Sequence, residues 1–182
     1  AQQGMSDRAL SLLEEAYGAD STNLTYARAL SAGYIEAGRM QDALRINERL
    51  SEADPEDDDV RYRLIQLYAR TGELKKGIQL ATELQKRFRP MPEAYGQLTK
   101  MKIQLLALSK DSVAVGREYR AWAALYPEDR RPYYDWILHL FQTGGAKEAE
   151  KQLTSDVRAG RISSGDATAL RVHKYILQKD YP

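Results

Sequence analysis

The chain has 182 residues, of which 43% are apolar and 29% are charged, enough apolar surface to build a core. Lysine and arginine number 27 against 26 acidic residues, so the net charge of +1 gives no overall field that would attract nucleic acid or an anionic membrane. The absence of cysteine excludes disulfides, thiolate chemistry and cysteine-ligated zinc, and no apolar run reaches the roughly 20 residues of a membrane span. The composition predicts a soluble protein without nucleic-acid binding or direct membrane insertion, and it leaves the compartment open between periplasm and cytoplasm.

Small residues recur along the chain at a fixed period of 34 residues. Glycines occupy positions 4, 38 and 72, and Ala9, Ala43 and Gly77 form a second register with the same spacing. A period of this length is typical of a small helical unit that buries its apolar face by stacking on copies of itself. The function of such a protein is expected on its surface.

The first segment, residues 1–22, is expected to be the second helix of a partial repeat. Gly4 stands in the register of the turn glycines, and Ala9, Leu13 and Ala16 follow it at helical spacing. On this interpretation the residues before Gly4 are the end of a preceding helix.

Residues 23–56 and 57–90 are predicted to be two complete helical hairpins. Each has apolar residues at three-, four- and seven-residue steps on both sides of a turn glycine, and the first ends at Pro55, which cannot continue a helix. The apolar positions are Leu30, Tyr34, Ala43, Ile46 and Leu50 in the first hairpin and Leu64, Tyr68, Gly77, Ala81 and Leu84 in the second.

Residues 91–128 are expected to form a longer hairpin, and residues 129–162 a regular one. Gly72 and Gly144 are separated by four residues more than two periods, and the apolar stripe that ends at Leu108 is about one turn longer than its predecessors. The turn of the longer hairpin is predicted near Lys110. The next hairpin should begin at Pro132 and turn at Gly144.

The last segment, residues 163–182, is predicted to be a terminal helix or the first helix of a further repeat. Ser164–Gly165–Asp166 can cap its start, and Lys179–Asp180–Tyr181 match the end of a first helix and the next turn. Two interpretations stay open. The chain is either a segment of a longer array, which we expect, or it ends in a solvating cap.

These residues resemble the tetratricopeptide repeat, because Leu30, Tyr34, Gly38, Ala43 and Pro55 fit its loose pattern. The sequence departs from that pattern where Ala27 and Arg61 replace the usual early tryptophan, and where Ser31 and Ile65 replace the usual small residue. The resemblance implies an all-α fold, a right-handed superhelical solenoid of antiparallel helix hairpins over residues 1–182. Small residues at positions 43, 77 and 149 would let paired helices approach closely, and tyrosines at positions 34 and 68 would fill space against the neighbouring repeat.

The sequence contains no recognisable catalytic, metal or cofactor motif. The two histidines, His139 and His173, lack a local ligand set, and neither a nucleophile elbow nor a phosphate-binding loop is present. The acidic run Glu56–Asp59 lacks the ligand spacing of a calcium loop and precedes a helix start, where negative charge is favourable. We expect no enzymatic activity, no metal and no cofactor.

The resemblance also implies a concave groove lined by the first helix of each hairpin. The positions carried over as partner contacts are Arg28, Glu36, Tyr62, Gln66, Arg70, Lys100, Gln104, Tyr134 and Phe141. Tyrosines and arginines supply area and hydrogen bonds together, which suits an extended peptide or a partner helix. The two asparagines with which a subclass of these repeats holds chaperone tails are replaced by Ala32 and Gln66, so that ligand is not expected.

Three hypotheses about function follow. The favoured one is a noncatalytic scaffold that binds a protein or peptide. The alternative is a portion of a larger bacterial secretion, polysaccharide-export or outer-membrane assembly protein, since such proteins carry long, divergent arrays of these repeats. The third is self-association through apolar faces of the terminal helices.

Overall fold

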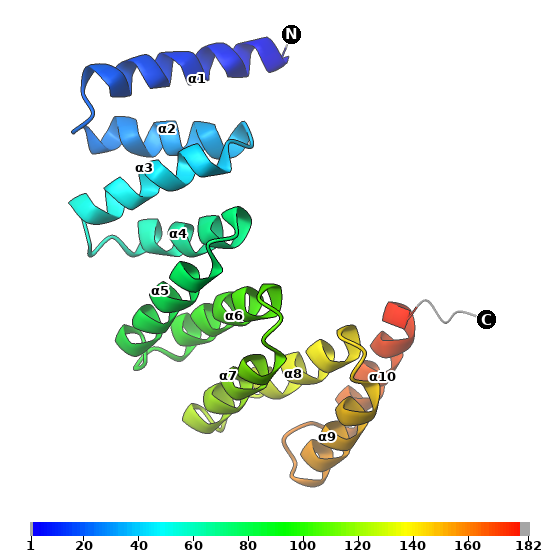
Figure 1. The fold of residues 1–182 in the computed structure, drawn as a ribbon. Coiled ribbons are helices and arrows are strands. Elements are labelled where there is room, and N and C mark those ends of the chain that lie inside the picture. The colour runs from blue at the N-terminus through cyan, green and yellow to red at the C-terminus, as the bar shows by residue number, and fades with distance from the viewer. Residues whose placement is uncertain (1, 179–182) are drawn as a thin grey trace. The chain divides into compact units, whose positions relative to one another are not determined.

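In the computed structural model, residues 2–178 are described, and over this range the chain forms ten α-helices and no strand (Figure 1). The all-α class expected from the period is therefore confirmed. The helices are α1 Gln2–Ala19, α2 Leu24–Glu36, α3 Met40–Ala53, α4 Asp58–Thr71, α5 Leu74–Arg87, α6 Pro92–Leu108, α7 Ser112–Leu125, α8 Arg131–Gln142, α9 Ala146–Arg158 and α10 Ser164–Gln178.

The chain divides into two compact units, Ala1–Lys110 and Asp111–Pro182. In the first unit each helix packs on the next one along the chain, and α4 also packs on α6. In the second unit α7 packs on α8, α8 packs on α9, and α10 packs on both α8 and α9. The boundary lies in the turn of the longer hairpin, between α6 and α7. A single solenoid domain over residues 1–182 stays a prediction.

The helices of the first unit alternate as the period of 34 residues requires. The pair α2 and α3 lies within residues 23–56, and the pair α4 and α5 lies within residues 57–90. Helix α6 has 17 residues, whereas α2 has 13 and α4 has 14. The expected extra turn in the third hairpin is therefore present in its first helix, because the apolar stripe there continues to Leu108.

The predicted turn at Gly4 is wrong, because α1 runs without interruption from Gln2 to Ala19. A glycine inside a helix costs only about 1 kcal/mol relative to alanine, so it does not end a helix by itself. The register of the glycines alone could not distinguish the two cases. The turn expected at Lys179–Tyr181 lies outside the described residues.

Side-chain caps fix the starts of several helices. The carboxylate of Asp57 accepts a hydrogen bond from the amide of Val60 at 3.1 Å, and that of Asp111 accepts one from Ala114 at 2.9 Å. Helix α10 begins at Ser164 as expected, but its capping oxygen is Ser163 Oγ, which accepts a hydrogen bond from the amide of Asp166. Each cap satisfies an amide that has no partner inside its helix.

The turn glycines adopt the left-handed conformation that side chains disfavour. Gly38, Gly72 and Gly144 have φ angles of 74°, 83° and 82°. Lys110, at the turn of the longer hairpin, has a φ angle of 60° without being a glycine. A side chain in this region is strained by about 1 kcal/mol or more.

Replacing Lys110 by glycine is therefore expected to raise the free energy of unfolding by about 0.5 to 1 kcal/mol, since relief of the strain exceeds the added freedom of the unfolded chain. Urea denaturation followed by circular dichroism measures this change. Gly72→Ala is the matched control and should lower stability by about 1 kcal/mol. A destabilised Lys110→Gly variant would contradict the expectation.

Gly77 allows α5 to approach two helices at once. A Cβ atom at this position would lie 2.9 Å from Leu105 Cδ1 of α6 and 3.1 Å from Tyr68 Cβ of α4, both closer than carbon atoms normally pack. The role of a small residue at position 77 is therefore confirmed, and Ala43 and Ala149 are likewise fully buried. The close approach is maintained by the absence of a side chain.

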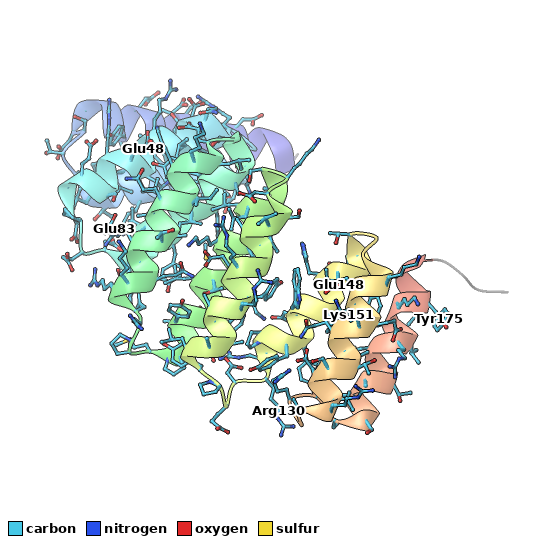
Figure 2. The ribbon with its side chains drawn as sticks, turned by 60° about the horizontal axis from the view of Figure 1, so that its bottom comes forward. Glu48, Glu83, Arg130, Glu148, Lys151 and Tyr175 are labelled. Carbon is cyan, nitrogen blue, oxygen red and sulfur yellow. The ribbon has the colours of Figure 1, made fainter. Side chains whose placement is uncertain are left out.

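Tyr34 and Tyr68 join each hairpin of the first unit to the helix before it. The hydroxyl of Tyr34 donates to Glu14 Oε1 of α1 at 3.1 Å, and that of Tyr68 donates to Glu48 Oε1 of α3 at 3.0 Å. Glu48 is labelled on α3 in Figure 2. Both rings are buried against the core. Packing of these tyrosines against the neighbouring repeat, expected from the sequence, is confirmed.

Burial and the hydrogen bond to Glu48 raise the pKa of Tyr68 to about 12. Because the folded state favours the protonated phenol, this group stabilises the fold fully below pH 10 and loses that contribution as the pH rises towards 12. We expect Glu48→Gln to lower the pKa of Tyr68 but to leave it above 10, since burial persists. Absorbance titration of the tyrosinate, with Tyr68→Phe as the subtraction control, measures it. An unchanged pKa would mean that Glu48 has no influence.

Candidate functional site

The predicted contacts on α4 and α6 lie at equivalent positions of two packed helices. Gln66 and Lys100 are 34 residues apart, as are Arg70 and Gln104, and all four side chains are exposed. Because α4 packs on α6, the four form one polar surface, which we call the α4–α6 face. The alternation that buries Leu64, Leu67 and Leu98, among others, leaves this stripe in solvent.

The remaining predicted contacts of the first unit are placed differently. Glu36 is exposed near the end of α2. Tyr62 is half-buried, with its ring centroid 6.3 Å from that of Phe88, and burial raises its pKa. Arg28 is committed to an ion pair with Asp57, the cap of α4. The sequence could not show this pair, because its partners are 29 residues apart.

The predicted contacts of the second unit are largely used by packing. The hydroxyl of Tyr134 donates to Asp166 Oδ2 at 2.5 Å and so joins α8 to α10. Phe141 is only 3% exposed and belongs to the core formed by α8, α9 and α10. Since α10 packs on α8, its side chains cover the surface where Phe141 was expected to meet a partner. We therefore leave Phe141 out of the proposed surface.

The acidic run before α4 has structural roles. Burial raises the pKa of Asp57, but the hydrogen bonds from the Val60 amide and Arg28 outweigh it and hold this pKa below its usual range. Asp58 forms an ion pair with Arg87 at 3.2 Å. No group of three or more potential ligands that could hold a metal ion occurs within the part of the chain that the structure describes. The arrangement suits helix capping.

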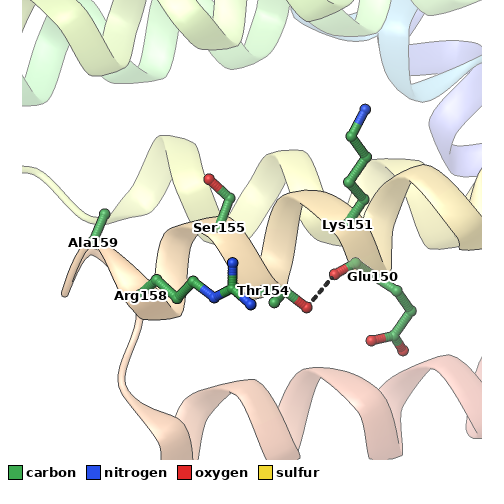
Figure 3. A pocket seen from close by; sticks show the side chains of 6 residues that line it. All are labelled: Glu150, Lys151, Thr154, Ser155, Arg158 and Ala159. Carbon is green, nitrogen blue, oxygen red and sulfur yellow. Dashed lines mark hydrogen bonds between the residues drawn. The ribbon is translucent and has the colours of Figure 1, made fainter.

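A hollow of about 680 Å³ lies over α9, but its residues all come from that one helix (Figure 3). Glu150 points towards α10, where it pairs with Arg171 at 3.0 Å and Lys174 at 3.8 Å, whereas Lys151 points the opposite way. Thr154 donates to the backbone oxygen of Glu150 at 2.8 Å. No set of polar groups converges on a ligand position, so this hollow is a shallow surface.

His139 belongs to an aromatic cluster and is not placed as a ligand. Its ring is stacked on Trp136, with centroids 5.8 Å apart and planes at 15°, and lies 6.1 Å from the ring of Tyr119. Burial lowers the pKa of His139, so the imidazole is neutral at pH 7. A neutral ring packs against apolar neighbours without an uncompensated charge.

We expect the second unit to lose stability as the pH falls below about 6.5, the usual histidine value, and through the lower pKa of folded His139. The sign follows because the unfolded state binds the proton more readily than the folded state does. Thermal unfolding measured from pH 7.5 to pH 5 in wild type and in His139→Gln tests this. The variant should have a flatter profile, and His173→Gln, at an exposed position, serves as the control. Parallel profiles for wild type and His139→Gln would exclude His139 as the cause.

Among the helices within residues 2–178, none combines the length and the apolar character that a membrane span requires. The sequence profile described as tetratricopeptide repeat matches residues 1–57 and 34–100. A comparison with curated proteins found no match.

Solved structures with a similar fold include a tetratricopeptide repeat protein from Parabacteroides merdae, with a TM-score of 0.61 and 18% identity over 98% of this chain and 68% of that chain. Another is MamA MSR-1, with a TM-score of 0.60 and 16% identity over 94% of this chain and 90% of that one. A third is MamA AMB-1, with a TM-score of 0.58, 17% identity, and coverage of 87% and 93%. At these identities the likeness shows the fold.

The profile match covers more than half of the chain, and it falls on the hairpins whose turn glycines, small residues and tyrosines are described above. The helical-repeat fold agrees with the solved structures. Repeats of this kind generally serve as noncatalytic scaffolds for protein–protein interaction. The chain belongs to the tetratricopeptide repeat family.

Proposed function

We propose that this chain is a noncatalytic scaffold that binds a protein or peptide partner over the α4–α6 face. Gln66, Arg70, Lys100 and Gln104 would make the central contacts, with Tyr62 at the margin. The observation that supports this most directly is the alignment of four exposed, long polar side chains on two packed helices.

The chemistry of the α4–α6 face suits an extended segment that carries carboxylates. Its charged members are Arg70 and Lys100, and its two glutamines can both donate to and accept from a peptide backbone. The guanidinium of Arg70 has only a weak contact, at 3.7 Å from Met40 Sδ. It can therefore turn to a carboxylate without breaking an ion pair. Glu36, on α2, would select against acidic residues farther along the partner.

The test begins with affinity capture on the immobilised chain from a lysate of the organism that makes it. The captured protein, identified by mass spectrometry, is then purified and titrated against variants. Charge reversal at Arg70 and Lys100 together is expected to weaken binding at least tenfold. Charge reversal at Lys75 and Lys86, two exposed lysines of α5, changes the net charge equally and should have a much smaller effect. Equal binding by wild type and the folded Arg70→Glu, Lys100→Glu variant would exclude this face.

We propose self-association through α10 as a second candidate, supported by its exposed apolar side chains. Val172, Tyr175 and Ile176 are 53%, 56% and 49% exposed, and Tyr175 is seen on the outer side of α10 in Figure 2. Sedimentation at several protein concentrations distinguishes the two candidates. A mass that rises with concentration in wild type but not in Tyr175→Glu would support association through α10, and a monomer at all concentrations would exclude it.

The export-protein alternative predicted from the sequence gains no support from a particular contact or surface of the described residues. It stays a prediction that the length and composition of the parent gene product can test.

A further inference from the structure

A small cavity with aromatic walls lies in the second unit, between α7 and α9 and above α8. Its volume is about 90 Å³, and the rings that line it belong to Tyr119, Tyr133 and Trp136. Helices α7 and α9 both pack on α8, which forms the floor. None of the contacts predicted from the sequence lines this cavity.

The size of the cavity limits what it can hold. It corresponds to about three water molecules at roughly 30 Å³ each, and it is smaller than the roughly 150 Å³ cavity that accepts a benzene ring. Ligand sites for cofactors are usually about 300 Å³ or more. A single aliphatic side chain is therefore the occupant that fits.

The walls of the cavity are held in place before any ligand arrives. The ring centroids of Trp136 and Tyr119 are 5.4 Å apart, and the opposite face of the cluster is supported by the stacked ring of His139. Gly116 of α7 leaves room for Trp136, since a Cβ atom there would lie 3.2 Å from Trp136 Cη2. A preformed apolar wall binds an aliphatic group without an ordering cost.

The polar groups at the base of the cavity are already satisfied. Asp156 is fully buried, and its carboxylate accepts hydrogen bonds from Arg161 Nε at 2.7 Å and from Gln152 Nε2 at 3.1 and 3.2 Å. The guanidinium of Arg161 also lies 5.4 Å from the ring centroid of Tyr133. A carboxylate beside aromatic rings could otherwise attract a methylated ammonium group. Here Arg161 already occupies the cationic position.

Arg120 provides the charge that a ligand would meet at the cavity mouth. It lines the cavity, is exposed, and is paired with no described carboxylate. Arg117, one turn earlier on α7, is also exposed. This local positive charge favours a carboxylate next to the aliphatic group and opposes a cation.

We propose that this cavity is a second docking site, which binds a partner segment carrying an aliphatic side chain next to an acidic residue. The aliphatic group enters between Tyr133 and Trp136, and the carboxylate pairs with Arg120. This site is independent of the α4–α6 face, because all of its residues belong to the second unit.

The test uses the full chain, isotope-labelled for NMR, and three blocked tetrapeptides. The first contains leucine followed by glutamate, the second leucine followed by glutamine, and the third trimethyllysine followed by glutamine. The first should shift the Trp136 indole resonance in a saturable way with a millimolar dissociation constant. The second should bind three- to tenfold more weakly, and the third should not saturate.

Two variants test the assigned contacts. Arg120→Gln should remove the preference for glutamate over glutamine, whereas Arg117→Gln should retain it. Ala123→Leu places a larger side chain on the cavity wall and should abolish the shift while the circular dichroism spectrum stays unchanged. If Ala123→Leu does not fold, the Arg120 comparison still decides. The proposal would be overturned by the absence of a saturable shift with the leucine–glutamate peptide, by tighter binding of the trimethyllysine peptide, or by an unchanged preference in Arg120→Gln.

Discussion

Replacing Trp122 by alanine is expected to lower the free energy of unfolding by about 3 to 5 kcal/mol, the usual cost of truncating a buried aromatic side chain. Trp122 is completely buried and is the largest of the fully buried side chains. Its indole Nε1 donates to Asp129 Oδ2 at 3.1 Å, and the Arg131 guanidinium lies 5.7 Å from its ring centroid. The substitution removes apolar packing and also takes a hydrogen bond from the Asp129 carboxylate.

Urea denaturation monitored by circular dichroism measures this loss. Val113→Ala, which truncates a 68% exposed side chain on the same helix, is the matched control and should change stability by less than about 0.5 kcal/mol. Trp122→Phe should lie between the two, because it retains a ring but no donor. A loss below about 1 kcal/mol in Trp122→Ala would mean that Trp122 is not central to the packing of the second unit.

Replacing Arg161 by methionine is expected to destabilise the protein by about 3 kcal/mol, because removing one partner of a buried ion pair leaves the other charge uncompensated. The side chain of Asp156 is 1% exposed, and Arg161 Nε lies 2.7 Å from its Oδ1. The side chain of Arg161 is itself 35% exposed, and Gln152 still donates to Asp156. The loss should therefore lie at the lower end of the range for buried pairs.

The double variant Arg161→Met, Asp156→Leu separates the loss of the pair from the cost of an isolated charge. It should recover at least half of the stability, since an apolar pair of similar volume replaces the ionic one. Arg158→Met, at an exposed position of α9, is the control and should be nearly neutral. If the double variant is no more stable than Arg161→Met, the loss comes from the packing of the arginine stem and not from the buried carboxylate.

The predictable part of the fold is carried by residues with a local conformational role. Gly38, Gly72 and Gly144 do adopt the left-handed turn conformation expected of them, because only glycine enters it without strain. The turn at Lys110 was located without a glycine, since the apolar stripe of α6 ends at Leu108. Gly4 shows the limit of this signal, because its neighbours continue as a helix.

The candidate site was predicted less completely than the fold. Gln66, Arg70, Lys100 and Gln104 are exposed at aligned positions, but Phe141 is buried. A groove-facing aromatic and a core aromatic can occupy neighbouring positions of the same helix, so helical periodicity does not distinguish them. Its burial follows from the packing of α10 on α8.

The sequence by itself determined the helices, the turns and the repeat family, because these depend on backbone conformation and on the spacing of apolar residues within one hairpin. Only the tertiary structure decided which polar groups stay exposed and which are used internally. The pairing of Arg28 with Asp57, the burial of Asp156 and the cavity beside Trp136 all join helices distant in sequence. Such contacts depend on how neighbouring helices pack in three dimensions, and a one-dimensional period of 34 residues does not carry that information.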